Sequence, residues 1–186
     1  MTAVLTPVVP TAVLRRATVQ DAAAIAAVRI DSWRATYRGM IPDAYLDGMR
    51  LEGSTELWTR VLSAPANNKT AVFVAEIDGE VVGFAAGMFL NEEKFGLNAE
   101  LSAIYLQPAA QRAGLGRRLV ALVAEAYRTH GASGLLVWVI AGNKGARKFY
   151  EQLGAELLIE QPFNWDGMDL LEAGYGWRDL PALAAK

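Results

Sequence analysis

The sequence predicts a single α/β (α+β) domain in which helices pack on both faces of one mixed sheet. Asp78-Gly79 joins two β-rich runs, as a tight hairpin turn would. After Leu115 an apolar stripe repeats at helical spacing. Residues 135–140 form an unbroken apolar run, which is typical of a strand buried on both faces. A chain of 186 residues with 53% hydrophobic content can bury the core of one such domain.

The amino-terminal part of the chain predicts one strand followed by three helices. Thr18 is placed to cap the first helix, Asp21 lies in its first turn, and the Gly- and Pro-containing stretch 39–42 ends it. Apolar residues of this helix recur at roughly helical spacing, namely Ile25, Val28 and Trp33. The expected elements are a strand at residues 13–17, the capped helix, and shorter helices at 43–49 and 54–62.

The middle of the chain predicts three consecutive strands. Residues 71–77 and 81–89 are β-rich and flank the Asp-Gly hairpin signal. Residues 91–98 are polar and contain a glycine, so they are expected to form a turn. The next strand is expected at residues 101–106.

The carboxyl-terminal part predicts two helices that alternate with strands. The helix after the glycine-bearing turn carries a clean apolar stripe, formed by Leu115, Leu119, Leu122, Val123 and Ala126. Gly131 ends that helix, and a second helix begins at Asn143 and ends at Gly154. The remaining expected elements are strands at residues 135–140, 155–160 and 168–175.

Composition excludes several classes of chemistry. The chain has no cysteine, which removes disulfides, Cys-ligated zinc and thiol nucleophiles, and its single histidine disfavours a His-rich metal site. No metal is therefore expected. No apolar run approaches the roughly 20 residues that span a membrane. We expect a cytoplasmic protein with no membrane contact, a flexible tail at residues 1–12 and a catalytic domain at 13–180.

Residues 111–117, Gln-Arg-Ala-Gly-Leu-Gly-Arg, are the most informative stretch of the chain. They link an expected strand to an expected helix, so free backbone N–H groups and the positive end of the helix dipole meet there. Such a turn suits a phosphate, and the two glycines are expected to let a ligand approach the backbone.

The distribution of charge supports a local anion site. Residues 101–150 hold seven Lys or Arg and one Glu, whereas the rest of the chain is acidic. A basic segment in an acidic chain favours a small anionic ligand over nucleic acid. A dinucleotide-binding fold is disfavoured because Leu119 stands where a third glycine is required. A loop that binds a nucleoside triphosphate is disfavoured because Arg117-Arg118 replaces the required Lys-Ser/Thr.

Two motifs give the chain a family resemblance. Gln111, Gly114 and Gly116 match a Gln/Arg-x-x-Gly-x-Gly/Ala signature, and Asn143 is followed by a tyrosine seven residues later and then by Gly154. With this order of elements, the chain resembles the GNAT superfamily of acetyl-CoA-dependent N-acetyltransferases over roughly residues 13–175. The resemblance implies a mostly antiparallel sheet whose fourth and fifth strands splay apart.

The resemblance also implies how acetyl-CoA is held. Pantetheine would pair with the backbone of the fourth strand, the pyrophosphate would rest on the N–H groups of the glycine turn, and Arg117 and Arg118 could meet phosphate oxygens. Asn143 would hold the pantetheine arm, although an ordinary helix N-cap is an equal alternative. The implied cofactor-binding residues are Ile104, Tyr105, Leu106, Gln111, Arg112, Ala113, Gly114, Leu115, Gly116, Arg117 and Asn143.

N-acetylation requires a base for the ammonium, donors for the oxyanion and an acid for the leaving thiolate. Glu100 is the candidate base, because it precedes Gln111 by eleven residues, as in histone-type members of the family, and strand alternation would place it with Ile104 and Leu106. The alternative is a strand-end carboxylate in water. Tyr150 is the candidate acid, its alternative being a core aromatic. An N–H near Leu106 is the expected oxyanion donor.

The acceptor side depends on side chains from the first helices. Trp33 and Tyr37 are i and i+4 neighbours and are candidate substrate contacts, with packing as the alternative. The expected acceptor is a primary amine of a small molecule or peptide, and dimers are common in this family. The rival hypothesis is a non-catalytic acyl-CoA-binding regulatory module.

Overall fold

The computed structural model describes residues 11–65 and 69–186, so the expectation for residues 1–12 falls almost wholly outside the described residues. A seven-stranded sheet has the order β1-β2-β3-β4-β5-β7-β6, in which β4 and β5 are parallel and all other neighbours antiparallel. The strands are β1 (Val13–Arg16), β2 (Thr70–Ile77), β3 (Glu80–Lys94), β4 (Leu97–Leu106), β5 (Leu135–Ile140), β6 (Glu156–Trp165) and β7 (Met168–Trp177).

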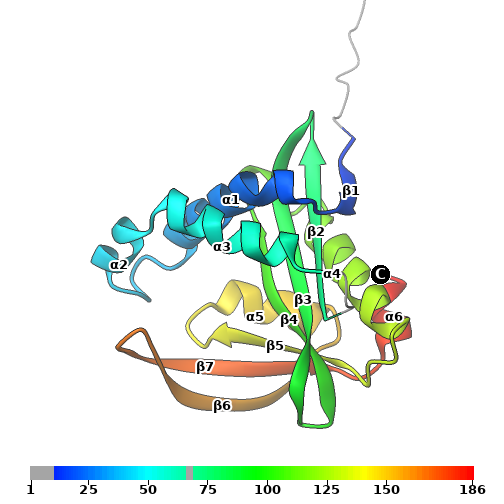
Figure 1. Cartoon of the computed structure of the whole chain (residues 1–186). Coiled ribbons are helices and arrows are strands. Elements are labelled where there is room, and N and C mark those ends of the chain that lie inside the picture. Colours follow the sequence, from blue (N-terminus) through cyan, green and yellow to red (C-terminus); the bar gives the residue numbers. More distant parts are fainter. Residues whose placement is uncertain (1–10, 66–68) are drawn as a thin grey trace, which may run out of the picture.

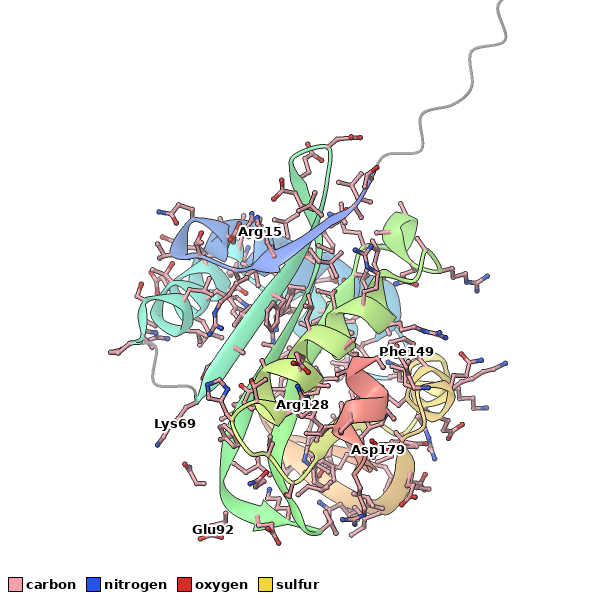
Figure 2. The ribbon with its side chains drawn as sticks, turned by 90° about the vertical axis from the view of Figure 1, so that its right-hand side faces the viewer. Arg15, Lys69, Glu92, Arg128, Phe149 and Asp179 are labelled. Atoms are coloured by element: carbon pink, nitrogen blue, oxygen red, sulfur yellow. The ribbon has the colours of Figure 1, made fainter. Side chains whose placement is uncertain are left out.

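Helices cover both faces of this sheet, as predicted (Figure 1). The helices are α1 (Ala22–Thr36), α2 (Asp43–Gly48), α3 (Leu51–Ser63), α4 (Leu115–Arg128), α5 (Lys144–Gln152) and α6 (Leu180–Ala184), with short 3-10 helices η1 (Val19–Asp21) and η2 (Pro108–Ala110). We call the side covered by α4, α5 and α6 the α4 face, and the side covered by α1 and α3 the α1 face. Figure 2 views the α4 face, with Arg128 at the end of α4 and Asp179 before α6.

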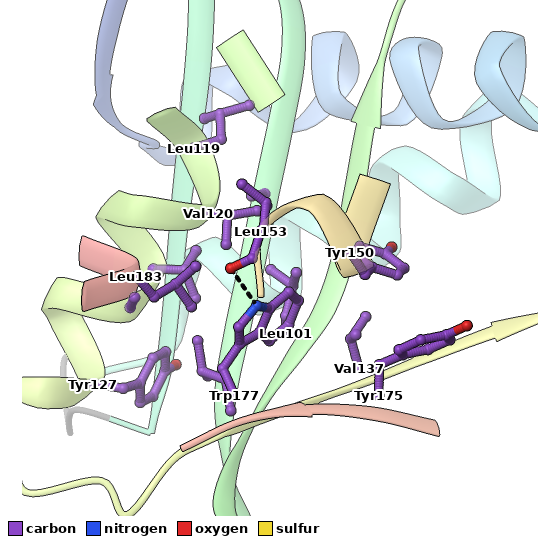
Figure 3. Close-up of a cluster of buried hydrophobic side chains, with 14 of the residues drawn as sticks. Leu101, Leu119, Val120, Tyr127, Val137, Tyr150, Leu153, Tyr175, Trp177 and Leu183 are labelled. Carbon is purple, nitrogen blue, oxygen red and sulfur yellow. Dashed lines mark hydrogen bonds between the residues drawn. The ribbon is translucent and has the colours of Figure 1, made fainter. Parts of the chain in front are cut away.

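The larger core lies under the α4 face (Figure 3). Leu119 and Val120 of α4 are completely buried there, and Leu183 brings α6 into the same cluster. Trp177 of β7 packs beneath them and donates its indole N–H to the Leu153 carbonyl at 3.2 Å. Leu115, Leu119 and Val123 of the stripe predicted for α4 thus face the sheet, whereas Leu122 and Ala126 are only half-buried. The sequence did not predict α6.

The fourth and fifth strands splay apart, as the resemblance implied. They pair only at their beginnings, through Ala99 with Leu135 and Glu100 with Leu136. From there β5 stays paired with β7 as far as Ile140, while β4 stays paired with β3. In Figure 1 the two parts of the sheet turn away from each other at this point. The edge of β4 beyond Glu100 is therefore left without a neighbouring strand.

Two hairpins are longer than the sequence predicted. The expected turn at 91–98 is wrong, because β3 runs to Lys94, β4 begins at Leu97, and only Phe95 and Gly96 turn, with φ of 55° and 78°. This hairpin tip is exposed on both sides, so its residues are polar without being a loop. Likewise β6 runs to Trp165, and Asp166-Gly167 makes the same kind of turn as Asp78-Gly79.

Candidate active site

The free edge of β4 presents backbone groups to the gap between β4 and β5. Gln107 N–H donates to the Val82 carbonyl at 2.8 Å, so Gln107 faces β3. Because successive residues of a strand alternate, Leu106 and Ile104 direct their N–H groups away from β3. The Leu106 carbonyl is already engaged, accepting from Ser32 Oγ at 3.3 Å and from Gln111 Nε2 at 3.1 Å. The N–H groups on this edge are therefore available to a ligand.

The turn before α4 forms a cradle of N–H groups. Arg112 and Gly114 both adopt left-handed conformations, with φ of 64° and 77°. The first helical bond of α4 is donated by Arg118 N–H to the Gly114 carbonyl at 3.2 Å. In the described part of the chain, the N–H groups of residues 112–117 have no hydrogen-bond acceptor. Alternating backbone conformations of this kind gather N–H groups around an anion.

The two glycines of this turn have different roles. Gly114 has open space around it and is required by its positive φ. A Cβ on Gly116 would lie 3.2 Å from Phe149 Cζ and 3.3 Å from Leu106 Cδ1. Gly116 therefore lets α4 pack closely against α5 and the end of β4, and the approach of a ligand to its backbone stays a prediction.

Gln111 connects this turn to the fourth strand. Its side chain donates to the Leu106 carbonyl, and its own N–H donates to the Pro108 carbonyl at 3.3 Å. Its amide nitrogen is thus occupied by the protein. The geometry favours a role in holding the turn at the end of β4.

Asn143 caps the N-terminus of α5, and its side chain also lies beside Tyr37. Its Oδ1 accepts from the Ala146 N–H at 3.1 Å, which is the N-cap that the alternative interpretation expected. It is 9% exposed and lies beside Tyr37, whose phenol pKa it lowers while burial raises that pKa more strongly. Asn143 therefore joins α5 to the end of α1.

Tyr150 lies in the core, yet its hydroxyl is free. Its ring is 5% exposed and packs edge-on against Trp177, with centroids 5.8 Å apart. Its hydroxyl has no hydrogen-bond partner among the described residues, and Figure 3 shows it directed away from Trp177. Burial raises the pKa of this phenol, and the nearby phenols of Tyr105 and Tyr37 raise it further. Tyr150 therefore keeps its proton at neutral pH.

Three phenols from distant elements meet at the gap. Tyr37 follows α1, Tyr105 lies on β4 and Tyr150 lies on α5. Tyr105 and Tyr37 both raise the pKa of Tyr150, and Tyr105 also raises the pKa of Tyr37. The sequence suggested Tyr105 only for its backbone, but its ring lies 6.4 Å from that of Trp33, between centroids. Burial is the main cause of the raised pKa of Tyr105.

Glu100 faces the α1 side of the sheet because β4 contains a bulge. Ala103 pairs with Ala86 and Leu101 with Gly87, so Ser102 is an extra residue without a partner on β3. Leu101 packs under the α4 face, but Tyr105 packs under the α1 face. The bulge reverses the alternation, so the expectation that Glu100 shares a face with Ile104 and Leu106 is wrong.

The surroundings of Glu100 make it a stronger base. Burial raises its pKa, the nearby Lys94 opposes this, and Glu172 of β7 raises it again. The sequence did not predict Glu172 as a neighbour of Glu100, because only the pairing of strands in the sheet brings the two carboxylates close together. It accepts from Gln161 Nε2 at 2.9 Å. Trp138 of β5 lies on the same face of the sheet as Glu100 and is only half-buried, although the apolar run 135–140 predicted burial on both faces. The Lys94 ammonium lies 5.9 Å from the centre of its ring.

Aromatic side chains gather at the end of α1, where the sequence predicted contacts to the acceptor. Trp33 and Tyr37 stack edge-on with centroids 5.1 Å apart, which confirms their predicted i, i+4 contact. Trp165, from the hairpin of β6 and β7, lies 4.8 Å from Trp33, and Tyr45 of α2 completes the aromatic cluster. The Trp33 indole N–H is buried and has no hydrogen-bond partner in the described residues.

The structure also limits other chemistry. Across residues 11–65 and 69–186, no three His, Cys, Asp or Glu side chains gather as a metal site would require. None of the described helices is both long and apolar enough to cross a membrane. The free strand edge and the N–H cradle at its end fit an elongated ligand with an anionic group, as acetyl-CoA is.

Known proteins are similar to this chain in sequence. The model of the acetyltransferase (GNAT) family matches residues 30–155. The uncharacterized N-acetyltransferase YuaI of Bacillus subtilis is 39% identical over 91% of this chain and 95% of its own length. A probable N-acetyltransferase of Mycobacterium tuberculosis, Rv2775, is 27% identical over 87% of this chain and 91% of its own.

Solved structures agree in fold. The PaiA N-acetyltransferase of Thermoplasma acidophilum, solved in complex with coenzyme A, superposes with a TM-score of 0.71 at 21% identity, covering 88% of this chain and 98% of that one. The family match spans more than half of the chain and includes the splayed strands, the glycine turn and all of α5. The chain therefore belongs to the acetyltransferase (GNAT) family and is an acetyl-CoA-dependent N-acetyltransferase.

Proposed function

We propose that this enzyme transfers the acetyl group directly from acetyl-CoA to a primary amine of a small molecule or peptide. The observation that carries the proposal is the convergence at the gap between β4 and β5. Free N–H groups line one side of that gap, and the unpartnered hydroxyl of Tyr150 lies near the phenols at its other side. Together they provide a place for the thioester and an acid for its leaving group.

Backbone groups would hold the coenzyme. The N–H groups of residues 112–116 would bind the diphosphate, assisted by the exposed Arg117 and Arg118. The edge of β4 at Ile104–Leu106 would pair with the amides of pantetheine, as a neighbouring strand would. Asn143 caps α5 with its oxygen and keeps its amide nitrogen for Tyr37 or the pantetheine arm.

Glu100 would take the proton of the attacking ammonium, directly or through one water. A carboxylate of ordinary pKa is a weak base for this task, and burial of Glu100 raises its pKa toward the working pH. The bulge at Ser102 places Glu100 on the α1 side, where Tyr105 and the aromatic cluster lie. The base and the acceptor contacts are thus on one side of the sheet.

Tyr150 would protonate the departing thiolate. Its raised pKa keeps it protonated until a strong base forms beside it, and the buried setting raises the pKa of the thiol as well, because both anions are desolvated. The N–H groups of Ile104 and Leu106 would stabilise the oxyanion formed during attack.

Release of free thiol from acetyl-CoA across an amine library tests this proposal. We expect at least one primary amine to be acetylated, and Tyr150→Phe to lower turnover at least tenfold with CoA affinity nearly unchanged. Tyr127→Phe is the matched control, because this buried phenol accepts from the Ala71 N–H at 3.0 Å and lies outside the gap. If no amine consumes acetyl-CoA while CoA still binds, the non-catalytic regulatory module replaces the proposal.

A further inference from the structure

A cavity of about 510 Å³ lies between α1, α2 and the start of α3. Its size is that of a small-molecule site. Tyr45 lines it and belongs to the aromatic cluster, with its ring 5.4 Å from that of Trp165. Through Tyr45, the cavity thus adjoins the aromatic cluster.

Two arginines line this cavity, and no acidic side chain does. Arg29 of α1 stacks over the Trp33 ring at 4.6 Å. Among the described residues, neither the Arg29 nor the Arg50 guanidinium has a hydrogen bond or an ion pair, although the Arg50 carbonyl accepts from the Ser54 N–H at 3.2 Å. The neighbouring arginines differ: Arg34 donates to the carbonyls of Leu46 and Met49 at 3.1 Å, and Arg38 pairs with Asp43 and Asp47. The cavity therefore holds two guanidinium groups that no acidic side chain of the described residues neutralises.

A third polar group in this cavity also lacks a partner. Ser54 lies in the first turn of α3 and is 9% exposed. Its hydroxyl is buried and has no hydrogen-bond partner within the described chain. A buried hydroxyl without a partner is destabilising unless a ligand satisfies it. The first turn of a 13-residue helix adds free N–H groups and a positive dipole end beside Arg50.

We propose that this cavity binds an oxyanion carried by the amine acceptor, so that the preferred substrate is an amine bearing a carboxylate or a phosphate group. The inference rests on the proposed function, because it assigns the far end of the same acceptor. Arg29 would bind the oxyanion through its guanidinium fork, held in place by Trp33. Arg50 and Ser54 would complete the site. The amine end would extend past the aromatic cluster toward Glu100.

Four acceptors of equal chain length test this proposal: an ω-amino acid, an ω-aminoalkyl phosphate, a diamine and a simple alkylamine. We expect kcat/KM for at least one of the two anionic acceptors to be at least ten times that for the alkylamine. The same acceptor should exceed the diamine in kcat/KM by an even larger factor. Arg29→Gln should bring this preference close to one, while Arg29→Lys should retain part of it. Arg60→Gln on the exposed side of α3 is the matched control and should leave it unchanged. The two anionic acceptors show which oxyanion is preferred.

Direct binding separates this inference from the function itself. The enzyme–CoA complex can be titrated calorimetrically with the ω-amino acid and with the aminoalkyl phosphate. We expect the preferred acceptor to bind, and Arg29→Gln and Arg50→Gln each to raise its Kd about tenfold. Such binding without any acetylation would leave the anion site standing and remove the proposed function. Equal rates for all four acceptors, or equal losses for all four in Arg29→Gln, would overturn the anion site and leave the acetyltransferase proposal intact.

Discussion

The proposed active site has a coenzyme half and an acceptor half, and these halves consist of different chemical groups. The coenzyme half, as proposed, consists of backbone groups: the N–H groups of residues 112–117 and the free edge of β4. The proposed acceptor half consists of side chains from α1, α2, β4 and the β6–β7 hairpin, with Trp33 at their centre. A backbone cradle needs only a few glycines in the right places, whereas a side-chain pocket can change its ligand through single substitutions. This difference explains how one coenzyme can serve many acceptors.

Replacing the base should have the largest effect. We expect Glu100→Gln to lower kcat about 100-fold. In the wild type, kcat/KM should rise with pH through a pKa above the usual 4.5, since the active form is ionised and burial raises this pKa. The variant should lack this rise. A pH–rate profile of both proteins is the measurement.

The stability of the same variant distinguishes a base from a structural carboxylate. A folded-state pKa above the unfolded value means that the folded protein holds its proton longer, so stability falls as pH rises from 4.5 through the raised pKa. Glu100→Gln should therefore be at least as stable as the wild type at neutral pH. A variant that unfolds more easily and keeps its turnover would assign Glu100 to structure.

The coenzyme half can be tested through a pair of glycines at the two ends of α4. Gly114→Ala and Gly131→Ala each force a side chain into a positive φ, 77° and 81°, with nothing within 4 Å. Both should cost stability by about 1–2 kcal/mol. Only Gly114→Ala should raise the Kd for CoA, by roughly tenfold, because it disturbs the N–H cradle. Equal CoA affinities of the two variants would show that the cradle does not bind CoA.

The acceptor half should respond in the opposite way. Trp165→Leu removes a ring that lies 4.8 Å from Trp33 but has no part in the cradle. Loss of such an aromatic pair, about 0.5–1.5 kcal/mol, should raise the acceptor KM roughly twofold to tenfold. The Kd for CoA should stay constant. A change in CoA affinity without a change in acceptor KM would mean that the two halves are not separate.

The smallest effect on activity is expected at an ion pair outside both halves. Asp21 accepts from Arg15 at 2.8 Å, which lowers the pKa of its carboxyl from 3.8 to about 2. Since the folded pKa is depressed, the stabilisation is present above 3.8 and is lost as pH falls through about 2. Asp21→Asn should melt at a lower temperature than the wild type at neutral pH, and this difference should vanish near pH 2 with kcat unchanged at neutral pH.

The sequence predicted the secondary structure around the proposed coenzyme half well because its signals are local. The glycine turn, the apolar stripe of α4 and the Asp78-Gly79 hairpin each lie within a few adjacent residues. The splay of β4 and β5 followed from the family resemblance and is confirmed by their two paired positions. Side-chain roles at Glu100, Tyr150 and the turn remain predictions, because the structure describes their surroundings and not their action.

The acceptor half was harder to predict because tertiary contacts create it. Ser102 carries no mark of a bulge, yet this one extra residue turns Glu100 to the other face of the sheet. Glu172 and Tyr105 join the site through elements far from it in sequence. Arg29 looks like any surface arginine of a helix until its lack of a partner and its cavity are seen.

Backbone amide shifts on titration with CoA test the backbone cradle most directly. Two-dimensional ¹⁵N–¹H spectra should show the largest changes at the amides of residues 112–117 and at Ile104 and Leu106, while the indole signal of Trp33 moves little. Shifts concentrated on α1–α3, with the amides of 112–117 unmoved at saturation, would contradict the division between a backbone half and a side-chain half.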